Sequence, residues 1–478
     1  MSSDPGTPIS TLLVDQIVAS MQRDIDTGSL AQGARLPSIR DLARRQGISR
    51  HTVVAAYDRL VAAGYLESRP GSGFYVAGRR IGSVDLGDTS GHRRAYDVAW
   101  LIRQALEDGS DVLKVGGPWL PDDWLDGKSI QRSLRALARQ SGAHLLHYGH
   151  PLGYLPLRQQ VQVKLQELGI TAAPDQIVLT AGTSQGLELA ARFLLQPGDT
   201  AFVEDPGYYN FFGYLRQYGV RLVGVKRNAD GPDIEALRAL APEHRPKAFF
   251  TQTMMQNPTG TDMAPSVMYR LLQAAEEFGF TIVEDDTYCD IGPTSAPRLA
   301  TLDQLSRVIY VRSFSKTLSG SFRVGFAVAS KPVADQLANL KVLSCITTSL
   351  FNEKLVYRLL VEGHYRKFLE QLRGRIARAR GSALRLLANT STEVFVVPAG
   401  GNFLWARLPN VEDSAALVKQ ARKHRIMLAP GAVFRPNLEP TPFMRFNVAL
   451  CGDPRLARFL KLIATSEGKT AAGPAAAT

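Results

Sequence analysis

The chain reads VIYVRSFSKTL at residues 308–318, where an apolar run gives way to a hydroxyl-rich turn that carries Lys316. The run is short and contains β-branched residues, which favours a buried strand with Lys316 just beyond its carboxyl end. An amine in such surroundings loses its proton more readily than one in water, and the neutral amine is the form that attacks a carbonyl carbon to make a Schiff base. The stretch therefore predicts a buried strand followed by a nucleophilic lysine.

Short apolar runs of the same kind precede this one, and amphipathic helical patterns separate them. Strands are expected at 176–179, 200–203, 248–251, 281–283 and 308–311, with helices at 184–195 and 264–278 among the intervening segments. Strand and helix alternating over this length predict an α/β fold with a mainly parallel sheet and helices on both faces. The segment 390–464 mixes strands and helices, so we expect it to form a smaller α+β cap domain.

Polar residues follow three of the expected strands. Asp285 comes after the strand at 281–283 and is suited to pair with a pyridinium nitrogen, which makes such a ring an electron sink. Asn257, in a Gln-Asn-Pro-Thr-Gly turn, is suited together with Tyr288 to hydrogen-bond a ring hydroxyl. The small-residue turn 181–186 begins a helix, and the free N–H groups and positive dipole end of a helix start favour a phosphate.

Two arginines and a serine complete this set of polar residues. Ser313 and Arg323 add a hydroxyl donor and a positive charge for the phosphate, while Arg445 is suited to bidentate capture of a carboxylate. Each residue alone is common in proteins without such a site. Their order along one chain is the informative observation.

The amino-terminal region predicts a helix-turn-helix. A first helix carries an apolar stripe at Leu12, Leu13, Ile17, Val18 and Met21. Ser38 is expected to cap a second helix and Ser49 a third, and Gly47 between them suits a tight turn. A hairpin at 65–76 follows, with glycines at its tip.

Positive charge gathers where such a motif meets DNA. In a helix-turn-helix the start of the second helix enters the major groove, which here places Ser49, Arg50, His51 and Thr52 at base edges. Residues 35–50 contain five arginines and one aspartate, a net charge of +4 where phosphates would lie. Arg69 at the hairpin tip suits the adjoining minor groove.

Composition sets the remaining limits. The 478 residues exceed a single domain, and the net charge of +12 is compatible with an anionic partner. Cys289, Cys345 and Cys451 fit neither a disulfide framework nor a zinc ligand set, so no metal is expected and a reducing compartment is favoured. Because no apolar run reaches the ~18 residues that span a bilayer, we expect a cytoplasmic protein without a membrane partner.

Four regions are expected along the chain. They are a DNA-binding domain at 9–76, a linker at 77–111, a cofactor-binding body at 112–464 and a disordered tail at 465–478. The many arginines between 366 and 385 are expected to form the solvated face of an amphipathic helix.

Residues 10–76 resemble the GntR winged helix-turn-helix. The likeness is carried by LPSIRDLARRQGISRHTV at 36–53 and by the closing Gly64-Tyr65-Leu66. It implies that DNA is contacted by Arg35, Arg40, Ser49, Arg50, Thr52, Arg69, Gly71 and Gly73.

Residues 112–464 resemble the pyridoxal-phosphate enzymes of fold type I, the aspartate aminotransferase class. The motifs that carry the likeness are Gly-Thr-Ser-Gln, Asn-Pro-Thr-Gly, Asp-x-x-Tyr and Ser-x-Ser-Lys, followed by Arg323 and Arg445. The resemblance implies that Lys316 forms the internal aldimine, that Asp285 pairs with the ring nitrogen, and that Arg445 holds a substrate carboxylate.

Further roles come from the same resemblance. Asn257 and Tyr288 would hold the ring hydroxyl, and Tyr208 would stack on the ring. The phosphate would be held by Thr183, Ser184, Ser313 and Arg323. Tyr148 would reach the phosphate of a neighbouring subunit, which implies a homodimer.

The combination resembles the MocR/GabR family of transcriptional regulators. It implies operator DNA as a partner, sensing of pyridoxal 5'-phosphate, an amino acid or amine as a further effector, and little or no turnover. One departure leaves residual transamination open: Thr287 intervenes, and Tyr288 lies three positions after Asp285. Two alternatives remain, an aminotransferase with an N-terminal dimerisation module and a cofactor-storage module without regulation.

Overall fold

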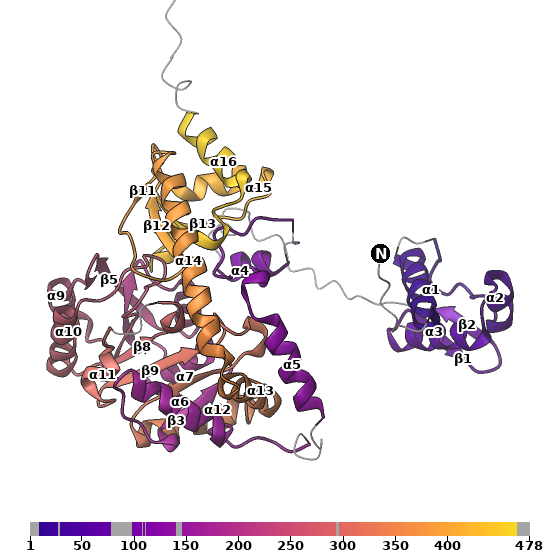
Figure 1. Cartoon of the computed structure of the whole chain (residues 1–478), viewed down its shortest axis with the longest axis horizontal. Helices are drawn as coiled ribbons and strands as arrows, with labels where there is room; N and C mark the ends of the chain where they lie inside the picture. Colours follow the sequence, from indigo (N-terminus) through magenta and orange to yellow (C-terminus); the bar gives the residue numbers. More distant parts are fainter. Residues whose placement is uncertain are drawn as a thin grey trace, which may run out of the picture. The chain divides into compact units, whose positions relative to one another are not determined.

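The computed structural model describes residues 9–26, 29–77, 98–107, 109, 111–139, 146–292 and 296–465 (Figure 1). Two compact units make up the chain, residues 1–89 and 90–478. Residues 78–97 of the expected linker and 466–478 of the expected tail lie outside the described part. No helix within the described ranges is both long and apolar enough to cross a membrane.

The first unit is three helices and a two-stranded wing. Its elements are α1 (Ile9–Asp26), α2 (Ile39–Gln46), α3 (Arg50–Ala62), β1 (Leu66–Arg69) and β2 (Gly73–Val76). The predicted caps begin both helices of the motif, since Ser38 Oγ accepts from Asp41 N at 3.2 Å and Ser49 Oγ accepts from Thr52 N at 3.1 Å. Gly47 ends α2 with φ +64°, a conformation that glycine adopts without strain.

One aromatic residue ties the wing to the helices. Tyr57 of α3 is fully buried; its ring meets Phe74 of β2 edge-on at 4.8 Å, and its hydroxyl donates to Pro37 O at 2.9 Å. Around it pack the buried apolar residues Val14, Ile17, Val18, Met21, Leu36, Leu42, Val53, Leu60, Leu66 and Val76. Burial of this set holds α3 and the wing in one rigid piece.

Part of the expected linker is a helix. Residues Val98–Glu107 form α4, within a stretch that the sequence analysis assigned to the linker. Ala105 is buried, and Gln104 accepts a hydrogen bond from Arg422. The Gly-, Arg- and Asp-rich residues just before it gave the whole segment a polar composition, which hid the short apolar run that begins at Val98.

The second unit is built on an eight-stranded sheet of order β3-β10-β9-β8-β7-β4-β5-β6. The strands in that order are Ile177–Thr180, Gly325–Val328, Val308–Ser313, Thr281–Asp285, Ala248–Thr251, Thr200–Asp205, Arg221–Asn228 and Gly231–Pro232. Strands β9, β8, β7, β4 and β5 are mutually parallel, while β10 and β6 pair antiparallel to their neighbours. The predicted mainly parallel sheet is therefore confirmed, with an antiparallel β10 that the sequence did not reveal.

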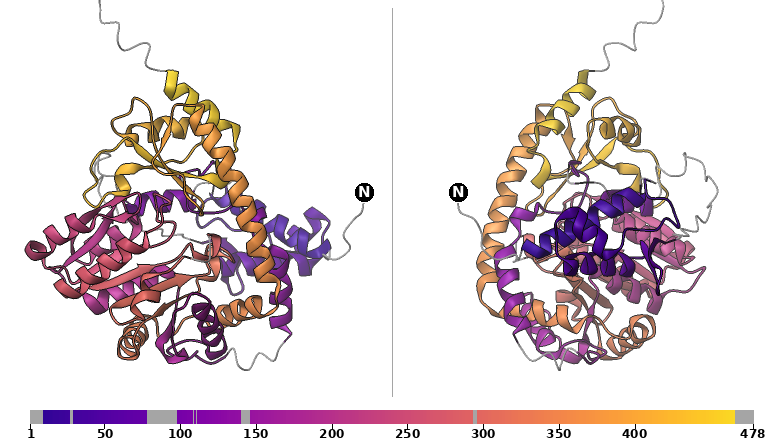
Figure 2. Two further views of the ribbon diagram at one scale, coloured as in Figure 1. Left: turned by 60° about the vertical axis from the view of Figure 1, so that its left-hand side comes forward. Right: turned by 90° about the vertical axis from the view of Figure 1, so that its right-hand side faces the viewer.

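Helices cover both faces of this sheet, as Figure 2 shows. One face carries α6 (Leu155–Glu167), α9 (Ile234–His244), α10 (Pro265–Phe278), α11 (Leu299–Asp303) and α13 (Leu350–Val361). The other carries α7 (Thr183–Leu194), α8 (Tyr209–Gln217) and α12 (Lys331–Cys345). Side chains alternate between the faces, so Phe249 packs in the first core and Phe250 in the second. Each buried phenylalanine contributes ~2 kcal/mol.

The cap domain is a four-stranded antiparallel sheet with helices on it. The sheet has the order β11 (Glu393–Val394), β12 (Phe403–Arg407), β14 (Phe443–Asn447) and β13 (Ala429–Pro430). Its helices are α14 (His364–Ala388), α15 (Val418–Lys423) and α16 (Pro454–Thr465). Helix α5 (Gly127–Ala138) packs on α13 of the large domain. The long α14 contributes to the cores of both domains and so joins them (Figure 2).

The turn between α2 and α3 gives a stability prediction. Gly47→Ala should lower the free energy of unfolding of the first unit by about 1 kcal/mol, because an L side chain at φ +64° is strained although no atom lies within 4 Å of the added Cβ. Gly374→Ala, inside the helical stretch of α14, is the matched control and should not destabilise. Urea unfolding followed by circular dichroism measures both. Equal behaviour of the two variants would contradict the turn assignment.

Candidate functional site

The residues predicted to bind a cofactor meet at the carboxyl edge of the parallel strands. Strand β8 ends at Asp285, β9 ends at Ser313 three residues before Lys316, and the Asn257 turn follows β7. Carboxyl ends of parallel strands share one edge of a sheet, and ligands of open α/β folds bind in the crevice outside that edge. The tertiary structure thus brings together side chains that lie far apart in sequence, such as Asn257 and Arg445, which are 188 residues apart.

Lys316 is a half-buried amine with few partners. Its Nζ donates to Pro118 O at 3.4 Å and lies 5.6 Å from the centre of the Tyr288 ring. Burial lowers the pKa of this amine to about 8; the positive charges of Arg445 and Arg323 lower it too, while Asp285 acts in the opposite direction. At neutral pH a tenth or so of the amine is therefore neutral, far more than for a lysine in water.

Asp285 is held by hydrogen bonds to both of its oxygens. Oδ1 accepts from Thr287 N at 3.0 Å and from Thr287 Oγ1 at 2.5 Å, and Oδ2 accepts from Gln252 Nε2 at 2.9 Å. Burial raises the pKa of the carboxyl to about 6, although these donors favour the ionised form. At pH 7 the group is an oriented, mostly ionised carboxylate at the end of a buried strand.

Arg445 lies in the middle of β14, beside the Asn257 turn. Its Nη1 donates to Asn257 Oδ1 at 2.6 Å and its Nη2 to Gly116 O at 2.5 Å. Because Asn257 Oδ1 is occupied by the guanidinium, the amide nitrogen of Asn257 is the atom left to contact a ring substituent. The Arg445 side chain is 1% exposed, and within the described residues its Nε has no hydrogen-bond partner.

Aromatic rings surround the Arg445 guanidinium. Its Cζ lies 4.4 Å from the centre of the Phe403 ring, 4.8 Å from that of Phe434 and 5.6 Å from that of Tyr209. Such rings stabilise the cation while excluding water. An unpaired N–H in a dry pocket suits an incoming anion, since a buried donor left unsatisfied is costly.

The start of α7 is shaped for an anion. Its cap residue is Gly182, with φ +79° and no side chain to accept the first N–H groups of the helix. Arg323 lies against this glycine: its Nη2 donates to Ala181 O at 2.9 Å, and a Cβ at Gly182 would come within 2.7 Å of it. Thr183 is buried at the first helical position, and Ser184 beside it is exposed.

The other predicted residues divide between this site and the surface. Tyr208 precedes α8 and hydrogen-bonds Ser184, and burial raises the pKa of its phenol. Ser313 is buried at the end of β9. Tyr148, by contrast, is 78% exposed and contacts none of the other predicted residues in any recorded interaction of the described chain.

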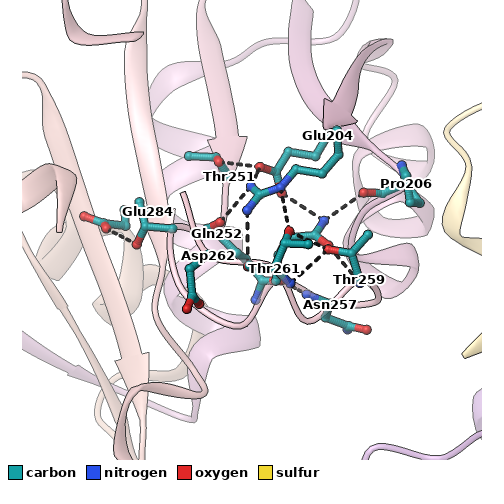
Figure 3. Close-up of polar contacts among 12 residues, drawn as sticks. Glu204, Pro206, Thr251, Gln252, Asn257, Thr259, Thr261, Asp262 and Glu284 are labelled. Atoms are coloured by element: carbon teal, nitrogen blue, oxygen red, sulfur yellow. Dashed lines mark hydrogen bonds and ion pairs between the residues drawn. The ribbon is translucent and has the colours of Figure 1, made fainter. Parts of the chain in front are cut away.

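A buried polar network lies next to the Asn257 turn (Figure 3). Glu204 of β4 accepts from Arg227 Nη1, from Thr251 Oγ1 at 2.7 Å and from Gln256 Nε2 at 3.0 Å. Gln256 Oε1 in turn accepts from the hydroxyl and the N–H of Thr259. Glu204, Gln256 and Thr259 thus form one connected set of buried hydrogen bonds, which orders the turn that carries Asn257.

Two residues of the site escaped the sequence analysis. Gln252 bridges the expected ring contacts, since its Nε2 donates to Asp285 and its Oε1 accepts from Asn257 N at 2.8 Å. Thr287 binds Asp285 and also lies 2.7 Å from Thr183, hydroxyl oxygen to hydroxyl oxygen. Gln252 belongs to no recognised motif; Thr287 was visible only as a departure from the family pattern.

These residues fit pyridoxal phosphate. The structure offers an amine with a lowered pKa, a carboxylate for the ring nitrogen, an amide for the ring hydroxyl and a helix start for the phosphate. The orphaned Arg445 Nε adds a place for the carboxylate of an amino acid. Each polar group of the cofactor thus finds a chemically matched partner at one edge of the sheet.

The first unit presents a basic surface at the start of α3. Arg40, Arg50 and Arg35 are exposed, and Ser49 is exposed at the cap of α3. Thr52 is only 8% exposed, because its hydroxyl lies 2.8 Å from Ser49 Oγ inside the cap. The cap therefore fixes the start of α3, where Arg50 is the first helical residue.

The wing is a second basic feature. Arg69 stacks over the Tyr75 ring at 4.5 Å and lies 3.6 Å from Glu67. Gly71 and Gly73 take φ +73° and +105°, which permits the tight tip between β1 and β2. Next to Gly73, the Arg35 side chain lies 3.7 Å from where a Cβ would stand. Arg35 forms an isolated antiparallel bridge with Tyr75 of β2, and Arg69 lies on the neighbouring strand β1.

Comparison with known proteins places both units in families. The model for aminotransferase class I and II matches residues 121–463, and the model for bacterial regulatory proteins, gntR family, matches residues 13–76. The chain therefore belongs to the aminotransferase class I and II family, with a GntR helix-turn-helix domain at its amino end. The fold class and the family predicted from the sequence are confirmed.

Individual relatives show the same pairing. The uncharacterized HTH-type transcriptional regulator YdcR of Escherichia coli (strain K12) is 30% identical over 442 residues, 91% of this chain and 94% of its own. The probable rhizopine catabolism regulatory protein MocR of Rhizobium meliloti is 30% identical over 366 residues, 75% and 73% of the two chains. The architecture is that of a MocR-type regulator.

A solved structure shares the fold of the second unit. It is LysN, the α-aminoadipate aminotransferase of Thermus thermophilus, complexed with N-(5'-phosphopyridoxyl)-L-leucine. The TM-score is 0.70 and the identity 28%, over 76% of this chain and 95% of that one. Aminotransferases of this class depend on pyridoxal phosphate, in agreement with the cofactor expected from the sequence.

The surroundings of Lys316 predict a pH profile. In cofactor-free protein, trapping of a small aldehyde on Lys316 by borohydride should rise with pH through a midpoint near 8, because only the neutral amine reacts. Arg445→Leu removes a charge that lowers the pKa and should raise the midpoint, whereas Asp285→Asn should lower it. Peptide mass spectrometry measures the adduct. A midpoint near the ordinary value of about 10.4 would contradict the assigned environment.

Proposed function

We propose that this protein is a pyridoxal-phosphate-dependent transcriptional regulator in which the group bound at Lys316 controls operator binding by the helix-turn-helix. The observation that carries the proposal is the convergence of Lys316, Asp285, Asn257 and Arg445 at one sheet edge, in a chain whose other unit presents a capped recognition helix. When bound, the cofactor supplies an aldehyde that bonds covalently to Lys316 and a ring that withdraws electrons.

The residues of the chain would divide the work of holding it. Asp285 keeps a proton on the ring nitrogen, and the amide nitrogen of Asn257 with the Tyr288 hydroxyl contacts the ring hydroxyl. Tyr208 covers one face of the ring. The N–H groups at the start of α7, with Ser184, Ser313 and Arg323, hold the phosphate, and Thr183 lies beside them at the first position of the helix. These assignments rest on the positions and hydrogen bonds described above.

The effector in this proposal is an amino compound with a carboxylate. Arg445 of β14 supports that choice because its Nε has no hydrogen-bond partner among the described residues, and because the guanidinium lies against the Phe403 ring and binds Asn257. An amino acid whose carboxylate binds Arg445 brings its amine toward Lys316, since Arg445 lowers the pKa of the Lys316 amine through space. Arg445 would hold the carboxylate of the amino acid, and Lys316 would be the amine with which its amino group competes; the change in charge at the site would be the signal.

The protein acts in this proposal as a homodimer that binds operator DNA. Exposed apolar side chains support a self-interface beside Tyr148: Leu146 is 84% and Leu343 81% exposed. The segments that carry them approach each other, since a Cβ at Gly149 would stand 3.8 Å from Thr348 O, three residues past the end of α12. In such a dimer Tyr148 is free to reach the phosphate of the partner subunit, as the resemblance implies.

A second candidate function is transamination, with an N-terminal module that serves only dimerisation. It is favoured by the completeness of the site, which retains the lysine, the aspartate and the carboxylate-binding arginine. The two candidates differ in what an added amino acid does. A regulator changes its operator affinity with little release of keto acid, whereas an aminotransferase releases keto acid over many cycles and leaves DNA binding unaltered.

Replacing the lysine tests the cofactor half of the proposal. Lys316→Ala should abolish the borohydride-stable adduct and the response of operator binding to added cofactor, because Lys316 is the amine that lies beside Asp285, Tyr288 and Arg445. Lys367→Ala, on the exposed face of α14, should retain both. Absorbance after reduction and gel-shift titrations measure them. An adduct that survives in Lys316→Ala would rule out the assignment.

Replacing the recognition arginine tests the DNA half. Arg50→Ala should weaken operator binding by about tenfold or more, since a base or phosphate contact contributes about 1–3 kcal/mol, and should leave cofactor loading unchanged. Arg59→Ala, on the same helix but paired with Asp15 at 2.6 Å, should stay within about threefold of the unaltered protein. Gel-shift titration at fixed salt compares the three. Equal losses in both variants would discredit the recognition helix.

A further inference from the structure

Three side chains form a continuous line from the start of α7 to the end of β8. Thr287 Oγ1 lies 2.7 Å from Thr183 Oγ1 and 2.5 Å from Asp285 Oδ1, while the Thr287 N–H also donates to Asp285 Oδ1 at 3.0 Å. Thr183 and Asp285 are both buried. The line therefore joins a residue expected at the phosphate to the residue expected at the ring nitrogen.

Counting protons fixes the direction of these hydrogen bonds. An ionised carboxylate only accepts, so the single hydroxyl proton of Thr287 goes to Asp285. The 2.7 Å hydrogen bond between the two threonines must then be donated by the Thr183 hydroxyl. While this line is intact, the Thr183 hydroxyl has no proton to donate to an anion at the start of α7.

We propose that Thr183 and Thr287 are positioning residues for Asp285, and that the Thr183 side chain serves the ring nitrogen through Thr287 rather than holding the phosphate. This inference rests on the proposed function. The phosphate is held by backbone N–H groups, by the exposed Ser184 hydroxyl and by Arg323, and the sequence-based role of the Thr183 hydroxyl is replaced.

The same geometry explains why Asp285 stays a usable carboxylate in a dry site. Burial raises its pKa to about 6, and without the Thr287 and Gln252 donors it would rise further. The titratable groups facing it from other elements are Tyr208, Tyr288 and Lys316; Asp286 follows it in the chain, and Glu204 of β4 lines the same cavity. None of these is altered by removing a threonine hydroxyl.

The test separates the ring nitrogen from the phosphate. Dissociation constants of the full-length protein for pyridoxal phosphate and for pyridoxal are measured from about pH 5 to 9. Pairing with a protonated ring requires ionised Asp285, so binding is lost as pH falls through its pKa. Thr287→Val should move that midpoint upward by about one unit, because the carboxylate loses a hydroxyl that donates to it. Thr183→Val should move the midpoint in the same direction but by less, because the Thr287 hydroxyl loses its own hydrogen-bond donor. Both should leave the ratio of the two dissociation constants within about twofold.

Matched variants give the opposite pattern. Ser184→Ala should reduce the preference for the phosphorylated ligand by about fivefold or more and leave the midpoint in place. Thr253→Val removes a hydroxyl that donates to Glu284 at 2.5 Å, next to Asp285 but on the other face of β8, and should change neither quantity. Thr287→Ser retains the hydroxyl and should restore the original midpoint if Thr287→Val fails to fold.

Two results would overturn the inference while sparing the proposed function. One is a Thr183→Val protein that loses phosphate preference as Ser184→Ala does, with its midpoint unmoved. The other is a midpoint that Thr287→Val leaves unchanged. Failure of the unaltered protein to bind pyridoxal phosphate would instead contradict the proposed function, and with it the role of Thr183 and Thr287 as positioning residues.

Discussion

The buried carboxylate of Asp285 is the group on which the rest of the site depends. A lone carboxylate at this depth would take up a proton, and burial does raise its pKa to about 6. Thr287 and Gln252 favour its ionised form by donating to both of its oxygens, and Oδ2, which accepts one hydrogen bond, keeps capacity for a further donor. A negative charge of fixed orientation can then face a positively charged ring without a cost of reorganisation.

Gln252 links the Asp285 carboxylate to the Asn257 turn. This residue bonds the carboxylate with one end and the Asn257 backbone with the other, so the aspartate and the amide are held at a fixed separation. The hydrogen bonds of Glu204 with Arg227 and Gln256 order the turn that carries Asn257 (Figure 3). Asn257 then binds Arg445, which belongs to the cap domain, and the Arg435–Asp205 ion pair joins the same two domains. A ligand at Arg445 therefore acts on the contact between large domain and cap.

In both units, the residue that caps a helix start sets the geometry of a candidate binding surface. Serine side chains cap α2 and α3 and so fix where the recognition helix begins, while a glycine caps α7 and leaves its first N–H groups for an anion. Helix starts thus set the geometry of both the candidate DNA surface and the candidate phosphate site. The difference lies in whether the cap residue supplies its own acceptor.

Local patterns in the sequence determined the elements and most of the site. The serine caps, Gly47, the apolar runs before Asp285 and Lys316 and the arginine at 445 were all readable, because caps, turns and buried strands depend on near neighbours. Only the tertiary structure decided the antiparallel β10, helix α4 and the hydrogen bonds of Gln252 and Thr287. The polar residues before α4 hid its apolar run, and the Gln252 bonds belong to no motif. The pairing of β10 with β3 and the contact of Thr287 with Thr183 join residues more than 100 positions apart, because strands and hydroxyls find such partners only once the chain has folded.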